Sequence, residues 1–134
     1  MKQVLNRWIA NHARVPGVLA CGLHYPDRTV FSQSMNVAYP PIVLDPVWRC
    51  LADTFSVFHH HRIPSEFVRW QYQDAHLYAA IRSDNICCGI FVVQDADTSV
   101  HATLRRLLRE FKAIPATSSA PVQSGLAASA GGGR

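Results

Sequence analysis

Two segments are apolar on both of their alternating faces, and they limit the folds that this chain can adopt. Residues 17–25 (GVLACGLHY) and 86–94 (ICCGIFVVQ) have the length of single β-strands. Successive side chains of a strand point to opposite faces, so strands of this kind need a protein layer on both sides of their sheet. We therefore expect a sheet with both strands at its centre and with both of its faces covered.

Three helices are predicted around these strands. Residues 2–14 repeat apolar side chains at helical spacing. Asp45 followed by Pro46 is a helix start signal, an acidic N-cap with proline at the first helical position, and this helix should run through residue 61. A last helix is predicted from residue 97 or 98 to about residue 113.

Three more segments have strand character. Residues 29–37 are more polar than residues 17–25 and follow them after a short turn, so the two should form a hairpin. Residues 66–73 carry polar side chains on one face, and residues 75–82 follow closely. The polar pattern predicts that the second and third strands in chain order are the edges of the sheet.

The resulting order is helix–strand–strand–helix–strand–strand–strand–helix, and Pro16-Gly17-Val18 opens the first strand directly after the first helix. In these features residues 2–113 resemble the Roadblock family of dynein light chains and bacterial small-GTPase regulators. One difference lies in the first hairpin, where many members have an Asp-Gly pair and this chain has Pro26-Asp27-Arg28. The missing glycine changes the turn type.

The resemblance implies an α/β (α+β) fold of the profilin-like, Roadblock type. Its five-stranded antiparallel sheet would have the order 2-1-5-4-3, with the middle helix on one face and the two terminal helices on the other. The edge and centre positions predicted from polarity agree with this order. The domain would span residues 1–113, and residues 114–134, rich in Ala, Ser and Gly, are expected to be a disordered low-complexity tail.

The resemblance also implies a dimer formed through the middle helix and the third strand. In this chain the middle helix has a second, weaker apolar stripe beside the one that faces its sheet, and the third strand would be an exposed edge unless another strand paired with it. The predicted dimer interface is Val47, Trp48, Cys50, Leu51, Thr54, Phe55, Val57, Phe58, Phe67, Arg69, Trp70 and Tyr72.

No catalytic, metal-binding or cofactor-binding residue is predicted. Consecutive helical residues diverge by about 100°, so His59, His60 and His61 cannot close on one metal ion, and histidine near a helix C-terminus is explained by the helix dipole. A Cys88–His76 nucleophilic pair is disfavoured because an apolar strand raises the pKa of a thiol. A zinc enzyme that uses the histidine cluster remains a third hypothesis.

A small-molecule-sensing module is the alternative function. Such a module needs an internal cavity with convergent polar groups, and His24, Tyr78 and Cys21 are the only residues expected to line one. The helices, however, carry many large side chains that would fill such a space.

Charge and composition restrict the partners and the location. Residues 1–97 are neutral and the whole net charge of +4 lies in residues 98–134, unlike the continuous basic footprint of a nucleic-acid-binding protein. No stretch approaches the roughly 20 apolar residues of a membrane span, there is no signal-peptide pattern, and the four cysteines have no disulfide or metal spacing. We therefore expect a cytoplasmic, non-catalytic dimeric scaffold or regulator. It would pair with itself or a paralogue and bind a small GTPase or a related signalling or motility protein.

Overall fold

The computed structural model describes residues 2–64 and 67–115, which include every predicted helix and strand core. Nearly all of the predicted tail, residues 116–134, lies outside the described residues. In chain order the elements are α1 (Lys2–His12), β1 (Val18–His24), β2 (Val30–Ser34), α2 (Pro41–His60), β3 (Phe67–Gln71), β4 (Ala75–Ile81), β5 (Cys87–Val93) and α3 (Thr98–Ala113).

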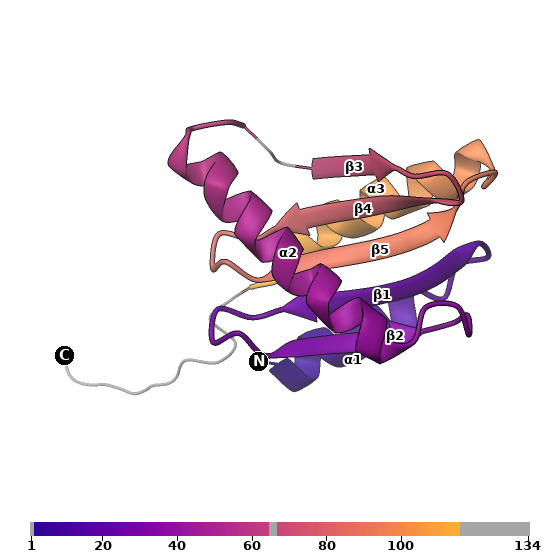
Figure 1. Cartoon of the computed structure of the whole chain (residues 1–134), viewed down its shortest axis with the longest axis horizontal. Coiled ribbons are helices and arrows are strands. Elements are labelled where there is room, and N and C mark those ends of the chain that lie inside the picture. Colours follow the sequence, from indigo (N-terminus) through magenta and orange to yellow (C-terminus); the bar gives the residue numbers. More distant parts are fainter. Residues whose placement is uncertain (1, 65–66, 116–134) are drawn as a thin grey trace.

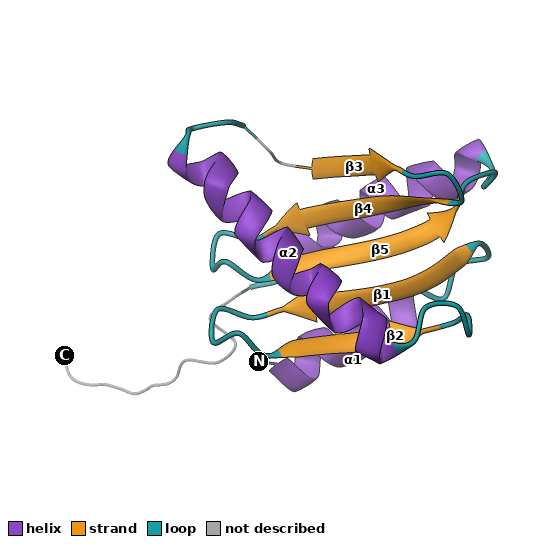
Figure 2. Ribbon diagram, in the orientation of Figure 1, coloured by secondary structure: helices purple, strands orange, loops and turns teal. Residues whose placement is uncertain are grey.

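The five strands form one antiparallel sheet in the order β2-β1-β5-β4-β3 (Figures 1 and 2). β1 and β5 lie at the centre, and β2 and β3 are the edges. The predicted fold class and strand order are therefore confirmed.

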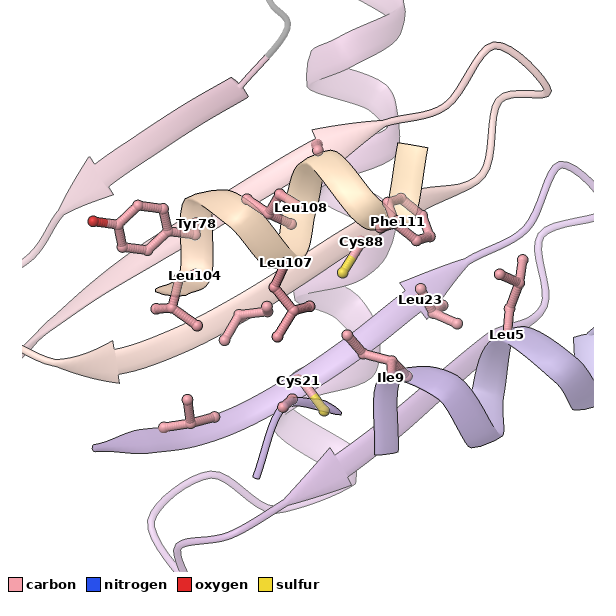
Figure 3. Packing of buried hydrophobic residues seen from close by; sticks show 14 of the residues in the cluster. Leu5, Ile9, Cys21, Leu23, Tyr78, Cys88, Leu104, Leu107, Leu108 and Phe111 are labelled. Atoms are coloured by element: carbon pink, nitrogen blue, oxygen red, sulfur yellow. The ribbon is translucent and has the colours of Figure 1, made fainter. Parts of the chain in front are cut away.

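Helices cover both faces of the sheet, as the two centrally apolar strands require. α2 crosses one face diagonally, and α1 and α3 lie on the other (Figure 1). Figure 3 shows the core on the α1 and α3 side, where Leu5, Ile9, Leu104 and Phe111 of the helices meet Cys21 and other residues of the strands. On the opposite face, α2 packs on a second core built from the alternate residues of the same strands.

A tryptophan in α2 fits onto two glycines of the central strands. Gly22 of β1 lies opposite Gly89 of β5 in the sheet. A Cβ on Gly22 would lie 2.1 Å from Trp48 Nε1, and a Cβ on Gly89 would lie 2.4 Å from Trp48 Cζ3. The two glycines thus leave the space that the indole fills, which brings α2 close to the middle of the sheet.

The predicted start of α2 at Asp45-Pro46 is wrong. The helix begins at Pro41, with Pro40 as its N-cap, and Pro46 lies inside it. The first N–H groups of a helix have no acceptor within the helix, so a proline, which has no N–H, loses nothing at this position. Its fixed φ is also helical, and the helix can therefore start at Pro41. Pro46 removes one backbone hydrogen bond, and the carbonyl left without it belongs to Ile42, a residue that is 82% exposed to solvent.

All five strands are shorter than predicted, and the difference is largest for β2 and β3. The strand predicted over 29–37 ends at Ser34, where Asn36 starts a loop by accepting a hydrogen bond from the amide of Ala38 at 2.9 Å. The strand predicted over 66–73 is Phe67–Gln71, and residue 66 lies outside the described residues.

Candidate interaction surface

α2 buries one row of large side chains against its own sheet. Trp48, Leu51 and Phe55 are exposed by only 1%, 4% and 1%, and Phe58 packs edge-on against Phe55 with ring centroids 6.4 Å apart. The first three belong to the predicted dimer interface, but they already fill the core of their own subunit. Their role is to hold α2 against the sheet, so a partner would contact the neighbouring rows of the helix instead.

A second row runs along the side of α2 that faces β3. Val43, Val47, Cys50, Thr54 and Val57 follow one another at intervals of four, three, four and three residues. This is the spacing with which one helix packs along another. We call these five residues the α2 flank. None of them is charged; Val43 and Val57 are 52% and 54% exposed, and Cys50 is exposed as well.

The edge strand β3 faces two ways. Trp70 packs on the α2 side of the sheet, and Tyr72, in the turn that follows, is 52% exposed. Phe67 pairs in register with Ala80, which belongs to the opposite core, and Arg69 shares that face by strand alternation. The structure therefore brings Trp70 and Tyr72 to the α2 flank but places Phe67 and Arg69 on the other face, because successive strand residues alternate.

A groove separates the α2 flank from β3. One hollow of about 190 Å³ is lined by Val47, Cys50, Leu51, Thr54, Trp70, Tyr72 and Leu77. A second hollow of about 440 Å³ shares Val47 and Tyr72 and continues past Tyr39 to the turn between β3 and β4. Predicted interface residues of α2 and predicted interface residues at the end of β3, Trp70 and Tyr72, therefore line the same groove.

Sequence reasoning missed the N-terminal part of this surface. Ile42 is 82% exposed, and Val43 extends the α2 flank by one turn. Both lie outside the helix that Asp45-Pro46 predicts. The Pro40-Pro41 pair is the signal that could have found them, since proline is favoured at the first position of a helix.

No protein-family model and no curated protein sequence matches this chain. Solved structures do match it. A Roadblock/LC7 domain from Streptomyces avermitilis superposes with a TM-score of 0.58 at 14% identity, over 80% of this chain and 93% of that one. The gliding protein MglB from Thermus thermophilus gives 0.65 at 13% identity, over 82% and 87%. An MglB with a tetrameric arrangement gives 0.64 at 13% identity, over 82% and 86%.

The chain has a Roadblock-type fold.

Within this Roadblock-type fold, the first hairpin is closed by an arginine in the left-handed region. Arg28 has φ 72°, and its amide donates to the carbonyl of Tyr25 at 2.9 Å. Its guanidinium lies 3.3 Å from Asp53 of α2. The turn thus takes the backbone conformation for which glycine is the default residue, while the arginine side chain ties the hairpin to the helix.

The three buried cysteines of this Roadblock-type fold are not poised for nucleophilic chemistry. Burial raises the pKa of Cys21 and of Cys87 to about 12, and it raises the pKa of Cys88 well above its usual value. Cys88 pairs in register with Ala80, four residues along β4 from His76, so the two side chains of the hypothetical pair are not brought together.

The histidine cluster at the end of α2 is divided between two surroundings. His59 borders a cavity beside α2, whereas the rings of His60 and His61 stand edge to face with centroids 5.2 Å apart. Among residues 2–64 and 67–115, no three His, Cys, Asp or Glu side chains are grouped so that they could hold a metal ion.

The structure does not bring His24, Tyr78 and Cys21 together around one cavity, as the alternative function would require. Cys21 and Tyr78 belong to the core beneath α1 and α3, whereas His24 faces the α2 side. Strand alternation separates them, since His24 and Cys21 are three residues apart in β1. In the described part of the chain, no helix is both long and apolar enough to cross a membrane.

Proposed function

We propose that the chain is a non-catalytic scaffold or regulator that works as a dimer, and that the α2 flank and the β3 edge form its interface. The observation that supports this most strongly is the α2 flank itself. It is an uncharged row with helix-packing periodicity, more than half exposed at Val43 and Val57, on a helix whose core-facing row is already buried. Burying such a row against a second helix removes apolar surface from water.

The edge strand adds a second contribution to the same interface. On one side β3 pairs with β4, and no strand of the described residues pairs with its other side. Unpaired strand edges invite association, and pairing with a second copy would satisfy them. Trp70 and Tyr72 at the end of this strand would then enlarge the apolar contact of the α2 flank. An MglB of the same fold has a tetrameric arrangement, which supports assembly of this chain with itself or a paralogue.

The proposed partner is a small GTPase or a related signalling or motility protein. This choice rests on the Roadblock resemblance and on the fold, which is shared with the gliding protein MglB. The role would be binding rather than catalysis, which the raised thiol pKa values of Cys21 and Cys87 support.

Light scattering on the full chain at micromolar concentration tests the dimer. A mass of two chains is expected, and a clean monomer would contradict the proposal.

A pull-down with small GTPases loaded with GDP or with a GTP analogue tests the partner, and the expected result is binding that depends on the nucleotide. Metal analysis of the purified chain distinguishes the non-catalytic scaffold from a zinc enzyme that uses the histidine cluster. Stoichiometric zinc would favour the enzyme.

A further inference from the structure

A cavity of about 680 Å³ lies on the other side of α2 from the α2 flank. It is bounded by the C-terminal half of α2 and by the β1–β2 and β4–β5 turns, which lie at the same end of the sheet in Figure 1. Small-molecule sites commonly occupy about 300–1,000 Å³. The volume therefore suits a small ligand, and the position leaves the proposed dimer interface untouched.

The floor of this cavity comes from three strands in register. His24 of β1 pairs with Cys87 of β5, which pairs with Ile81 of β4. Phe55 and Ser56 of α2 form the adjoining wall. The lining mixes apolar side chains such as Phe55 and Ile81 with polar residues such as Ser56, and polar groups in a small-molecule site fix the orientation of the ligand.

His24 is the polar group in the floor, and its hydrogen-bonding capacity is unused. The residue is 3% exposed, and neither Nδ1 nor Nε2 has a hydrogen-bond partner. Buried polar groups are nearly always paired, so an unpaired imidazole that lines a cavity needs an explanation. A ligand in the cavity would supply a partner for one of the two nitrogens.

The charges around the cavity are balanced. Arg28 at one turn pairs with Asp53 at 3.3 Å, and Arg82 at the other pairs with Asp84 at 3.1 Å and donates to the carbonyl of Phe111 on the opposite face of the sheet. Burial, and next the positive charge of Arg28, lower the pKa of His24, so the imidazole is neutral near pH 7 and has one donor and one acceptor nitrogen. These groups favour an uncharged ligand over an anion.

We propose that this cavity binds a small, uncharged, planar heterocycle, whose polar edge exchanges a hydrogen bond with one ring nitrogen of His24 and whose ring lies against Phe55 and Ile81. A flat heterocycle combines the two properties that the lining requires, because it has apolar faces and a hydrogen-bonding edge. The two turns would border the ligand through Arg28 and Asn85, both of which hold a left-handed backbone conformation.

Titration of the ¹⁵N-labelled full chain, followed by NMR, tests this site. The probes are adenine and nicotinamide as neutral heterocycles, with inorganic phosphate and benzoate as anionic comparators. His24→Phe keeps a ring but removes both nitrogens, Ser56→Trp fills the cavity from α2, and His60→Phe is the matched control outside the lining.

At least one heterocycle should cause saturable shifts in the backbone amides of Ala52, Ser83 and Asn85. Binding should weaken about tenfold in His24→Phe, the effect of losing a hydrogen bond to a buried group, and also in Ser56→Trp, but not in His60→Phe. The proposal is overturned if neither heterocycle shifts these amides, or if both cavity variants bind as the unmodified chain does. Equal or tighter binding of phosphate or benzoate would overturn the assignment to uncharged ligands.

Discussion

The indole N–H of Trp48 in α2 donates a hydrogen bond to the hydroxyl of Ser32 in β2 across 2.8 Å. The same hydroxyl donates to the carboxylate of Asp45 at 2.5 Å. Two residues of α2 are therefore joined to the edge strand through one serine. This chain of bonds fixes the rotation of α2 about its axis, and that rotation decides which row of the helix faces away from the core.

Replacing Ser32 with alanine should therefore destabilise the fold. Trp48 is 1% exposed, so its N–H would lose its acceptor without access to water. A loss of about 1–2 kcal/mol in the free energy of unfolding is expected. Ser34→Ala on the same strand is the control, because Ser34 bonds only within the exposed loop after β2, and its cost should be smaller. Urea unfolding measures both, and equal costs would contradict this role for Ser32.

Adding a methyl group at Gly89 should also destabilise the chain, by about 1–3 kcal/mol, because overpacking forces neighbours to move. The nearest atoms belong to the side chains of Trp48 and Leu51, at 2.4 and 2.9 Å. Trp48→Leu makes room beside Gly89, so Gly89→Ala should cost less in that background. A double-mutant cycle in urea measures the coupling. Additive costs would show that the contact between Trp48 and Gly89 is unimportant.

His24 should make stability fall in mildly acidic solution. Burial and Arg28 lower its pKa below the usual 6.5, so the unfolded chain takes up a proton at a pH where the folded chain does not. Stability is therefore complete above about pH 7 and is lost as the pH falls through the ordinary histidine range. His24→Phe should reduce the loss between about pH 7.5 and about pH 5.5, measured by urea unfolding. The pKa of His101 is also lowered by burial, so some pH dependence should remain. An unchanged loss in His24→Phe would contradict the prediction.

Cys50 should cross-link two copies of the chain. It is the middle residue of the α2 flank and is exposed, whereas Cys21, Cys87 and Cys88 are buried. In a two-fold interface the same row meets itself, so its middle residue lies nearest to its own copy. A short bismaleimide should yield a covalent dimer on a denaturing gel, and Cys50→Ser should abolish it. Cross-linking that persists in Cys50→Ser, or that vanishes on modest dilution, would argue against this geometry.

The sheet could be predicted because its signal is local. A strand that is apolar on both alternating faces must be covered on both, so residues 17–25 and 86–94 indicated β1, β5 and a sheet covered on each face. The start of α2 was mispredicted for the opposite reason. Asp45 has the sequence of an N-cap, but its carboxylate accepts a hydrogen bond from Ser32, a contact between distant segments that no local pattern encodes.

The candidate surface was predicted in part. The periodicity of α2 separated Val47, Cys50, Thr54 and Val57 from the row that faces the sheet, but it could not show that Trp48, Leu51 and Phe55 would be buried within the subunit. His24 was named among the residues that could line a ligand cavity, but the cavity beside α2 and the two turns was not predicted. It depends on how far the end of α2 stands from two turns, and side-chain size in the sequence does not determine that distance.

The dimer through the α2 flank is the central claim, and sedimentation equilibrium of two matched variants tests it most directly. Val57 in α2 and Val4 in α1 are helical valines with exposed fractions of 54% and 53%, so each glutamate substitution has a similar effect on an isolated subunit. The original chain and Val4→Glu should sediment as dimers at micromolar concentration, and Val57→Glu should weaken dimerisation by about thirtyfold or more, the effect of a buried charge at an interface. A monomeric original chain, or a Val57→Glu dimer as tight as that of Val4→Glu, would contradict the account.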